Sequence, residues 1–372
     1  MTQTVASDPL DPDALVHRVG SRPRHILRSM INIQLPDSPT TTTAAWPARA
    51  SSLGVLDQLP PEIMMAILSL LDLQSTARFA SVCFLGRSPA HASRAYRDVV
   101  AFALEALFAL KRLGLAGAHS VADLHAALCA ERCTSCNDYG VFLFLPTAER
   151  CCWECVRHNP QLRLLSLRDA KRFFVLSKRS VDELPRIHVI PGEYGLAQKP
   201  AAAQCVLTTV AAARALGIRE HGSLDKLAGA LLKRYTTGTR TGASLLSLGR
   251  FLQRGPRPVA QGQDICLLPT LANIPDDRFF GMASLPFPFL SPRGHIELGL
   301  WCEGCSCTLR QYSVSRVRGD VLKALVPPES KCHPTTVLMG LERRAYPRKA
   351  FLRHIKHCYG AQQLVPELRD GA

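Results

Sequence analysis

A chain of 372 residues with 47% hydrophobic and 20% charged residues has the composition of a folded globular protein, which excludes a disordered or collagen-like chain. Its length exceeds the size at which a single core keeps growing, so two or three packed units are expected. The formal net charge of +15 is spread along the sequence, with one modest cluster in residues 163–179 and no interleaved aromatic stacking pattern beside it, so nucleic acid is disfavoured as a partner.

Residues 1–52 are rich in Pro, Ser, Thr and Asp without a sustained period, which predicts a disordered tail. The first residues lack an apolar core behind a basic start, so no secretory or transit peptide is expected. The most apolar helical stretch, residues 98–113, is interrupted by Glu105 and is too short to span a membrane. We therefore expect an intracellular protein, in either the cytoplasm or the nucleus. Its fourteen cysteines would then be metal ligands or buried thiols rather than disulfides.

Residues 53–130 are predicted to be helical, with a motif over 53–100 followed by linking helices over 101–130. Two prolines at 60 and 61 stand where a helix can begin, and apolar residues follow at helical spacing from Ile63. A second short helix starts near Leu73. A third helical stretch over residues 91–117 ends near Gly114, as helices often do.

Residues 131–158 hold five cysteines, with a short strand predicted at Val141–Leu145. Two Cys-x2-Cys pairs are separated by fifteen residues, the spacing at which a hairpin returns the second pair to the first. We predict a closed zinc site whose ligands are Cys133, Cys136, Cys152 and Cys155. Cys151 is the spare cysteine, and it could replace Cys152 only at a less suitable spacing. Redox chemistry and unliganded thiols are the alternatives.

Residues 159–300 are predicted to be a mixed, largely helical region with a Gly-, Arg- and Ser-rich loop over 236–260. Residues 301–372 carry a second, less regular group that starts with Cys302-x2-Cys305. His354 and Cys358 are four apart on a predicted helix and can chelate one ion together. We predict a second zinc site from these residues: Cys302, Cys305, His354 and Cys358. Cys307 lies just beyond Cys305, and the other candidates for the later ligands are Cys332, His333 and His357. His357 is predicted to lie at the surface, because it points about 100° away from Cys358 on the helix. Isolated buried thiols beside a solvated histidine remain the alternative.

The stretch "LDQLPPEIMMAILSLLDLQSTARFASVC" (residues 56–83) resembles the F-box, by which substrate receptors attach to the Skp linker of a cullin-RING ubiquitin ligase. The matching positions are Leu59, Pro60, Glu62, Ile63, Ile67, Leu71, Asp72, Leu73, Val82 and Cys83. The chain departs from the motif after Cys83, where Gly86 and Pro89 occur, so the end of the third helix is open. The resemblance implies a docking face made of Leu59, Pro60, Ile63, Ile67, Leu71 and Val82. A buried helical hairpin is the alternative interpretation of the same pattern.

A wider resemblance runs over most of residues 55–365, excluding about 180–290. The segments "VADLHAALCAERCTSCNDYGVFLFLPTAERCCWECV", "WCEGC" and "FLRHIKHCYGAQQL" are similar to a family of fungal F-box proteins with the same cysteine pairs and late His-x3-Cys. The fold class expected is mainly α with small zinc-stabilised β elements, in which a helical F-box precedes an α+β cysteine-rich domain.

These expectations combine into a non-catalytic function. The sequence contains no nucleophile-elbow motif, no His-Glu-x-x-His helix and no paired acidic motif. Both predicted zinc sites have four protein ligands, which leaves no position for a reactive water. The chain is expected to be an adaptor with two structural zinc ions, which docks on Skp and holds an unidentified protein substrate near the ubiquitin-loaded enzyme. The alternative is a zinc-containing nucleic-acid-binding or scaffold protein that acts outside the ligase.

Overall fold

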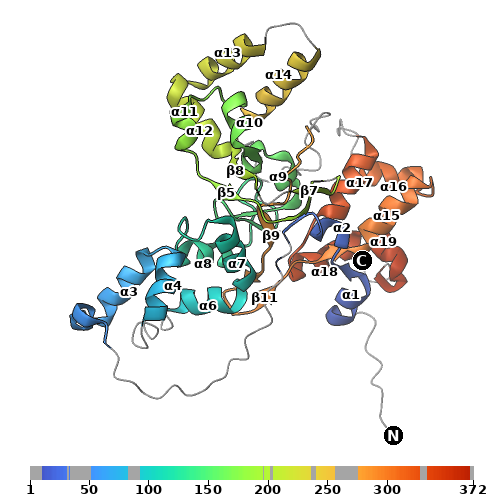
Figure 1. Ribbon diagram of the computed structural model, residues 1–372. Coiled ribbons are helices and arrows are strands. Elements are labelled where there is room, and N and C mark those ends of the chain that lie inside the picture. Colours follow the sequence, from blue (N-terminus) through green and yellow to red (C-terminus); the bar gives the residue numbers. More distant parts are fainter. Residues whose placement is uncertain are drawn as a thin grey trace.

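Three groups of helices surround a set of short antiparallel strands in the computed structural model of the chain (Figure 1). The structure describes residues 11–31, 33, 52–82, 93–195, 197–201, 204–235, 240–255, 275–326 and 333–368. The expected fold class, mainly α with small antiparallel sheets, is confirmed. None of the helices in these ranges is long and apolar enough to cross a membrane.

The N-terminal segment is ordered between residues 11 and 31, so the prediction of a disordered tail is wrong there. Its elements are α1 (Pro12–Val19), β1 (Gly20–Ser21) and α2 (Arg24–Leu27). Leu15 and Val19 are buried in the C-terminal core, and β1 pairs with a strand at residue 301. Local composition could not show these partners, because they lie about 280 positions away in the chain. The rest of the predicted tail, residues 1–10, 32 and 34–51, lies outside the described ranges.

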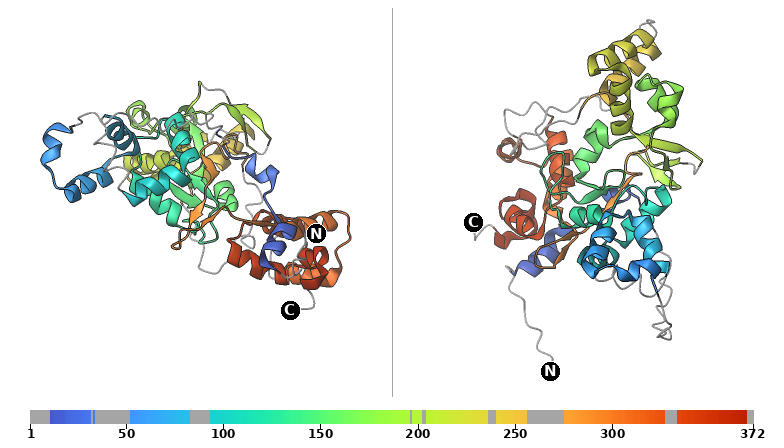
Figure 2. Two further views of the ribbon diagram at one scale, coloured as in Figure 1. Left: turned by 90° about the horizontal axis from the view of Figure 1, so that it is seen from below. Right: turned by 90° about the vertical axis from the view of Figure 1, so that its left-hand side faces the viewer.

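The first helical group carries the predicted F-box stretch. It contains η1 (Gly54–Gln58), α3 (Pro61–Leu70), α4 (Leu73–Val82), α6 (Arg94–Phe102), α7 (Leu104–Leu113) and α8 (Val121–Cys129). The helix α3 begins at Pro61, whose fixed φ suits a first helical position. The third predicted helix is divided at Ala103 into α6 and α7. Residues 83–92, where the motif departs from the F-box, lie outside the described ranges. Figure 2 shows α3 and α4 projecting away from the remaining elements.

The centre of the molecule is a three-stranded sheet of β3 (Glu149–Cys151), β2 (Phe142–Phe144) and β9 (Ser284–Pro286), in that order. The strand predicted at Val141–Leu145 is confirmed, and all three residues of β2 are buried. In the register of the sheet, Leu143 lies between Arg150 and Leu285. The sheet therefore joins the first cysteine block to residues far along the chain. Beside it lie α9 (Trp153–His158), η2 (Pro160–Leu162), β6 (Gly192–Tyr194), β7 (Lys199–Ala201), β10 (Phe289–Leu290) and β11 (Ile296–Glu297).

A second helical group stands at the top of Figure 1 on a sheet of β4 (Leu164–Ser166), β8 (Val206–Thr209) and β5 (Ile187–His188). Its helices are α10 (Leu167–Phe173), α11 (Lys178–Asp182), α12 (Val210–His221), α13 (Leu224–Tyr235) and α14 (Arg240–Leu252). The prediction of a loop over 236–260 is wrong for α14. Its residues Phe251 and Leu252 are buried in the core of this group, and that packing overrides the loop-like composition.

The third helical group follows β12 (Trp301–Cys302) and lies on the right of Figure 1. It consists of α15 (Glu303–Ser313), α16 (Gly319–Leu325), α17 (Pro334–Arg343), α18 (Arg348–His357), α19 (Tyr359–Leu364) and η4 (Pro366–Leu368). The N-terminal α1 packs on α18, and β1 extends β12 by antiparallel pairing. The two ends of the described chain therefore share one core.

Arg150 on β3 is the charged residue that ties the centre together. Its side chain is only 1% exposed. The guanidinium donates hydrogen bonds to the carbonyl oxygens of Ala127 (2.7 Å) and Phe287 (3.2 Å), and also to those of Gly140 and Pro288. Burial lowers the pKa of Arg150 to about 10, so the side chain is charged at neutral pH. One side chain thus fastens α8, the cysteine turn and the segment after β9.

Replacing Arg150 with Met should lower the free energy of unfolding by about 3 kcal/mol or more, because buried carbonyls then lose their donors. Urea denaturation followed by tryptophan fluorescence measures this change. Arg112→Met, at an exposed position on α7, is the matched control and should unfold as the wild type does. Equal midpoints for Arg150→Met and Arg112→Met would contradict the tethering role.

Candidate metal centres

The four predicted cysteines of the first block converge on one point. The Sγ atoms of Cys133, Cys136, Cys152 and Cys155 all lie within 4.8 Å of one another. Three of these residues are buried, and Cys136 is half-buried. The structure therefore brings together the residues that the spacing selected.

Two local structures present these sulfurs. Cys133 and Cys136 lie on a tight turn, in which the amide of Asn137 donates to the Cys133 carbonyl at 2.9 Å and the amide of Cys133 donates to the Asp138 carbonyl at 2.7 Å. Asn137 has a φ of 62°, a left-handed conformation that asparagine tolerates better than most residues. Cys152 precedes α9 and Cys155 lies in its first turn, a spacing that puts both on one side. The β2–β3 hairpin then brings the two pairs together.

The sulfur separations fit a tetrahedral metal ion. Metal–sulfur bonds of about 2.3 Å, as for zinc, place neighbouring sulfurs roughly 3.8 Å apart. The Sγ atoms of Cys136 and Cys152 are 3.6 Å apart, whereas a disulfide requires about 2.05 Å. All four cysteines are free thiols. The group could therefore hold one ion through four sulfur ligands.

The electrostatics of this group also favour a cation. Hydrogen bonds with Cys133 and Cys136, together with burial, raise the pKa of Cys152 well above its ordinary value. Hydrogen bonds from Cys136 and Cys152 lower the pKa of Cys133. The two shifts run in opposite directions because the thiols share hydrogen bonds, so that ionisation of one thiol opposes ionisation of its neighbours. A divalent cation allows the ligands to be thiolates together, so metal binding displaces protons.

Cys151, the spare cysteine, points elsewhere. It is fully buried, and its thiol donates to the Phe142 carbonyl across the hairpin at 3.7 Å. Adjacent residues in a strand face opposite sides, which explains why Cys151 and Cys152 separate. Burial raises the pKa of the Cys151 thiol well above its ordinary value. Cys151 is therefore a core residue and not a ligand.

The second predicted group also converges. Ligand atoms of Cys302, Cys305, His354 and Cys358 lie within 4.8 Å of one another. Cys302 is at the end of β12, Cys305 is in the first turn of α15, and His354 and Cys358 belong to α18 and the residue after it. Sγ of Cys358 is 3.7 Å from that of Cys302 and 3.8 Å from that of Cys305. These separations match a tetrahedral ion, so this group could hold a second metal.

The histidine of this group is oriented by an aromatic partner that the sequence did not suggest. The ring of Tyr346 stacks on that of His354, with centroids 4.5 Å apart. Nε2 of His354 then lies 3.2 Å from Sγ of Cys305. Tyr346 is itself fixed by two backbone hydrogen bonds with Leu300, two residues before Cys302. No spacing rule connects Tyr346 with these ligands.

Two glycines allow the helices of the second group to meet. A Cβ atom on Gly360 would lie 1.9 Å from the carbonyl oxygen of Gly304, and one on Gly304 would lie 2.2 Å from the amide of Ala361. Each distance is far below any real contact of a Cβ atom. Gly304 is adjacent to Cys305, and Gly360 is two residues after Cys358. Close approach of α15 and α19 therefore sets the distance between these two ligands.

The remaining sequence candidates do not reach the second group. The thiol of Cys307 accepts a hydrogen bond from the Gln311 side chain at 3.5 Å, His333 precedes α17, and His357 is exposed. The surface position predicted for His357 is confirmed. Cys332 lies outside the described ranges. Among the described residues, these two centres are the places where three or more potential metal ligands come together.

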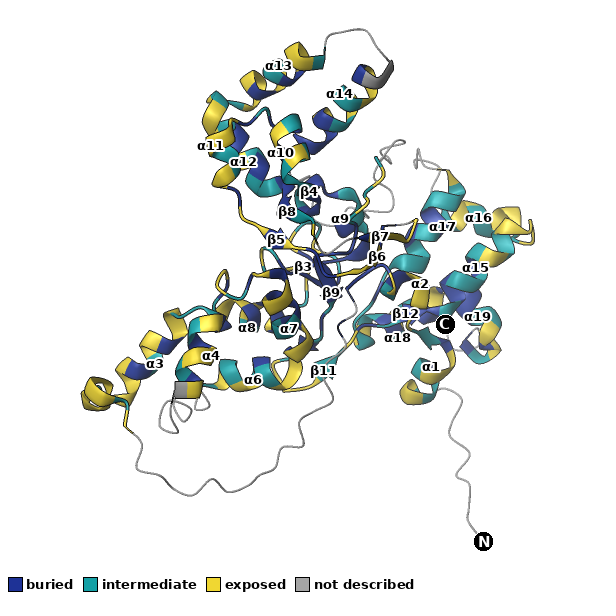
Figure 3. Cartoon of the chain, in the orientation of Figure 1, coloured by how far each residue is buried: buried dark blue, intermediate teal, exposed yellow. Residues whose placement is uncertain are grey.

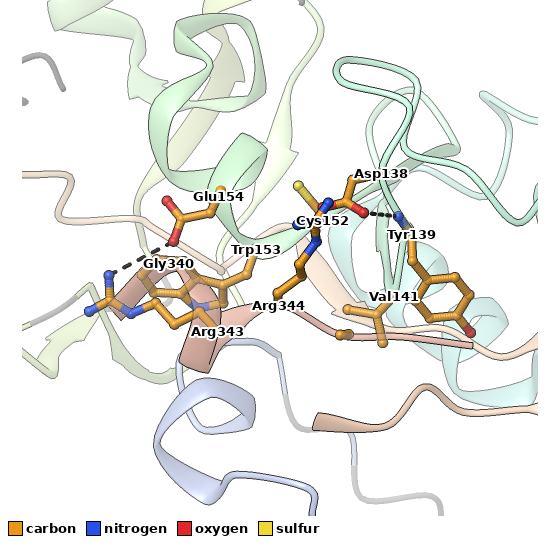
Figure 4. Close-up of a pocket in the computed structure, with 10 residues that line it drawn as sticks. Asp138, Tyr139, Val141, Cys152, Trp153, Glu154, Gly340, Arg343 and Arg344 are labelled. Atoms are coloured by element: carbon orange, nitrogen blue, oxygen red, sulfur yellow. Dashed lines mark hydrogen bonds and ion pairs between the residues drawn. The ribbon is translucent and has the colours of Figure 1, made fainter. Parts of the chain in front are cut away.

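The end of α17 contacts residues beside both centres, and Figure 4 shows Arg343 and Arg344 near Cys152, Trp153 and Glu154 of the first. The guanidinium of Arg343 lies 4.3 Å from the ring centroid of Trp153 and 3.9 Å from the Glu154 carboxylate, both next to Cys152. The carbonyl of Arg343 accepts a hydrogen bond of 3.0 Å from Trp301, the neighbour of Cys302. Arg344 forms an ion pair of 2.9 Å with Asp138. The cysteine turns are thereby coupled to one helix.

Among the predicted docking residues, some are partly buried against a small core and others are exposed to solvent. Leu59 and Leu71 are half-buried and pack on the small core between α3 and α4. Ile63 and Ile67 are 49% and 39% exposed on one side of α3, and Pro60 is exposed. Leu70, which the prediction omitted, is 83% exposed, and its spacing from Ile63 and Ile67 extends the same face. Val82 ends α4, and its side chain lies outside the described set.

No protein-family model, curated protein or solved structure matches the chain.

The two centres predict two metal ions per chain after expression with added zinc. Cys152→Ser should remove one ion and unfold the first block, and Cys305→Ser should remove the other, because binding energy is folding energy in such sites. Elemental analysis of the purified protein measures the stoichiometry. Cys151→Ser is the matched control and should retain both ions. Loss of an ion in that variant would show that the ligand assignment is wrong.

Close packing at Gly360 predicts that Gly360→Ala separates α15 from α19 and weakens metal binding at the second centre by about tenfold or more, the effect of losing about 1.4 kcal/mol. Competition with a chromophoric chelator reports the affinity. Gly319→Ala, on α16 with no neighbouring atom within 4 Å of the added Cβ, should leave both ions equally bound. Equal affinity of the Gly360→Ala variant would refute the packing requirement.

Proposed function

We propose that this protein is an F-box adaptor, a substrate receptor that docks on a Skp-type linker of a cullin-RING ubiquitin ligase. The observation that carries the proposal is the apolar face of α3, made of Ile63, Ile67 and Leu70 and left uncovered in the isolated chain. Full burial of such a side chain contributes about 1.5–3 kcal/mol. An exposed apolar helix face of this kind is typical of a surface that binds a partner helix.

The placement of α3 supports this proposal. The residues beneath it, Met64 and Leu68, are buried in a small core with Ala80 of α4, so the helix is held while its outer face stays free. Val55, 80% exposed in η1, adds apolar surface just before α3. Both helices project from the molecule (Figure 2). A linker protein could therefore reach this face without displacing another element of the described chain.

We further propose that both metals are structural zinc ions. Four sulfur ligands, or three sulfurs with one imidazole, suit zinc and leave no position for a reactive water. Their role is to hold the cysteine turns, α15 and α18 in place through the contacts described above. The receptor then acts by proximity, since a bound substrate is kept near the ubiquitin-loaded enzyme.

A cysteine, a histidine and an aspartate do meet outside the metal centres, at Cys129, His125 and Asp98. Nε2 of His125 is 3.0 Å from the Asp98 carboxylate and 3.7 Å from Sγ of Cys129. In a catalytic triad the nucleophile and the acid contact opposite ring nitrogens, whereas here both contact the same one. Burial and then the charge of Asp98 raise the pKa of Cys129, which disfavours a thiolate nucleophile. This cluster supports a non-catalytic role.

Charge on the docking face should abolish linker binding. Ile63→Asp combined with Ile67→Asp is expected to weaken binding to a purified Skp-type protein by at least about 100-fold, since two central apolar anchors are lost. Both residues are exposed, so the variant should keep its circular dichroism spectrum and both metal ions. Pull-down and calorimetric titration measure the interaction.

The matched control is Val314→Asp, at a residue 59% exposed in the C-terminal group, which should bind the linker as the wild type does. The milder pair Leu59→Ala with Pro60→Ala should also reduce recovery of the linker. If the wild-type protein does not recover Skp, or if the double Asp variant recovers it normally, the proposed function is wrong.

A further inference from the structure

The second helical group belongs to a stretch of the chain with a large net positive charge. Residues 163–254, called the basic lobe from here on, contain sixteen Lys and Arg but six Asp and Glu. This excess of ten compares with a net charge of +15 for the whole chain. The helices of this stretch stand together at the top of Figure 1.

Several of these cations occupy positions where they oppose helix stability. Arg168 lies in the first turn of α10, Lys178 is the first residue of α11, and Lys226 lies in the first turn of α13. All three residues are exposed, and Figure 3 shows exposed positions on each of these helices. The helix dipole favours anions at these ends and disfavours cations. Helix stabilisation therefore does not explain their placement.

The cations concentrate where α10 meets α13. Nε of Arg172 donates a hydrogen bond of 2.5 Å to the hydroxyl of Tyr235. The exposed residues Arg168 and Lys171 belong to the same helix as Arg172, and the exposed residues Lys233 and Arg234 directly precede Tyr235 on α13. Arg168 and Arg172 are four residues apart on one helix, where like charges repel. Such repulsion is relieved when an anion binds.

Two carboxylates of the lobe pair with other cations. Asp182 pairs with Arg186 at 3.7 Å, and Glu183 pairs with Arg219. Within the described part of the chain, no ion pair joins Arg168, Lys171, Lys233 or Arg234 to a carboxylate. These four charges are thus available to a partner.

The aromatic residues of the lobe distinguish between acidic partners. Phe173, Phe174, Tyr194 and Phe251 are buried, and half-buried Tyr235 has its hydroxyl bonded to Arg172. Single-stranded nucleic acid is held by bases stacked on exposed aromatic side chains, which the described lobe does not offer. Binding of carboxylates requires only exposed Lys and Arg side chains, and α10 and α13 carry such side chains.

We propose that the basic lobe binds an acidic segment of a partner protein through the exposed cations of α10 and α13. That this partner is a ligase substrate rests on the proposed function, whereas the attraction itself does not. The lobe lies apart from α3 in Figures 1 and 2, so the acidic segment and the Skp-type linker can be bound at the same time.

The test uses the full chain loaded with zinc and a fluorescent peptide of alternating Glu and Ser. Fluorescence anisotropy should report binding that weakens as salt is added. Replacing Arg168, Lys171, Lys233 and Arg234 with Ala should weaken it by about tenfold or more, as expected for the loss of four surface ion pairs. The matched control replaces Arg24, Arg28, Arg316 and Lys323, exposed cations outside the lobe, and should bind the peptide as the wild type does.

Three results would overturn the inference: no binding of the Glu/Ser peptide by the wild type, equal loss in both quadruple variants, or tighter binding of a duplex DNA of the same charge. The last result would assign the lobe to nucleic acid. Skp recovery is measured on the same preparations. Retained Skp binding with no peptide binding refutes the lobe alone, and peptide binding without Skp recovery refutes the adaptor function alone.

Discussion

Four ligand atoms within 4.8 Å of one another, three of them on buried residues, impose the constraint on which this structure depends. Thiolates at such distances repel, so they can all be ionised only around a cation. Hydrogen bonds within each group, together with burial, raise the pKa values of Cys152 and Cys305. A metal ion held at either group would replace the repulsion between thiolates with four bonds. Those bonds would also fix the turns and helix ends that carry the ligands.

The two centres are parts of one connected interior. The end of α17 contacts Trp153 beside the first centre and Trp301 beside the second. Arg150 fastens the first cysteine hairpin to α8 and to the segment after β9. The N-terminal α1 adds Leu15 and Val19 to the core around the second centre. Two features lie at the periphery of this interior and face solvent in the described structure. They are the apolar face of α3 and the cations of the basic lobe.

Local patterns predicted the features that depend on near neighbours. The Cys-x2-Cys pairs and His354 with Cys358 were recognisable because residues three or four apart lie on one side of a turn or helix. The strand at Val141–Leu145 and the start of α3 at Pro61 followed from composition alone. The tail over residues 1–52 and the loop over 236–260 were predicted wrongly where long-range packing acts. Val19 is buried in the core that contains Cys302, and Phe251 is buried in the core that contains residues of α10 and α12.

The sequence by itself determined which side chains can bind metal and how the members of each pair are presented, because bond geometry and helix periodicity relate residues a few positions apart. Only the tertiary structure decided which pair meets which, and what orients them. The ring of Tyr346 stacks on that of His354, and the absence of side chains lets the backbones of Gly304 and Gly360 approach closely. The guanidinium of Arg150 donates hydrogen bonds to four carbonyl oxygens. Each of these contacts joins segments that chain geometry does not hold together, so their proximity is a property of the packed core.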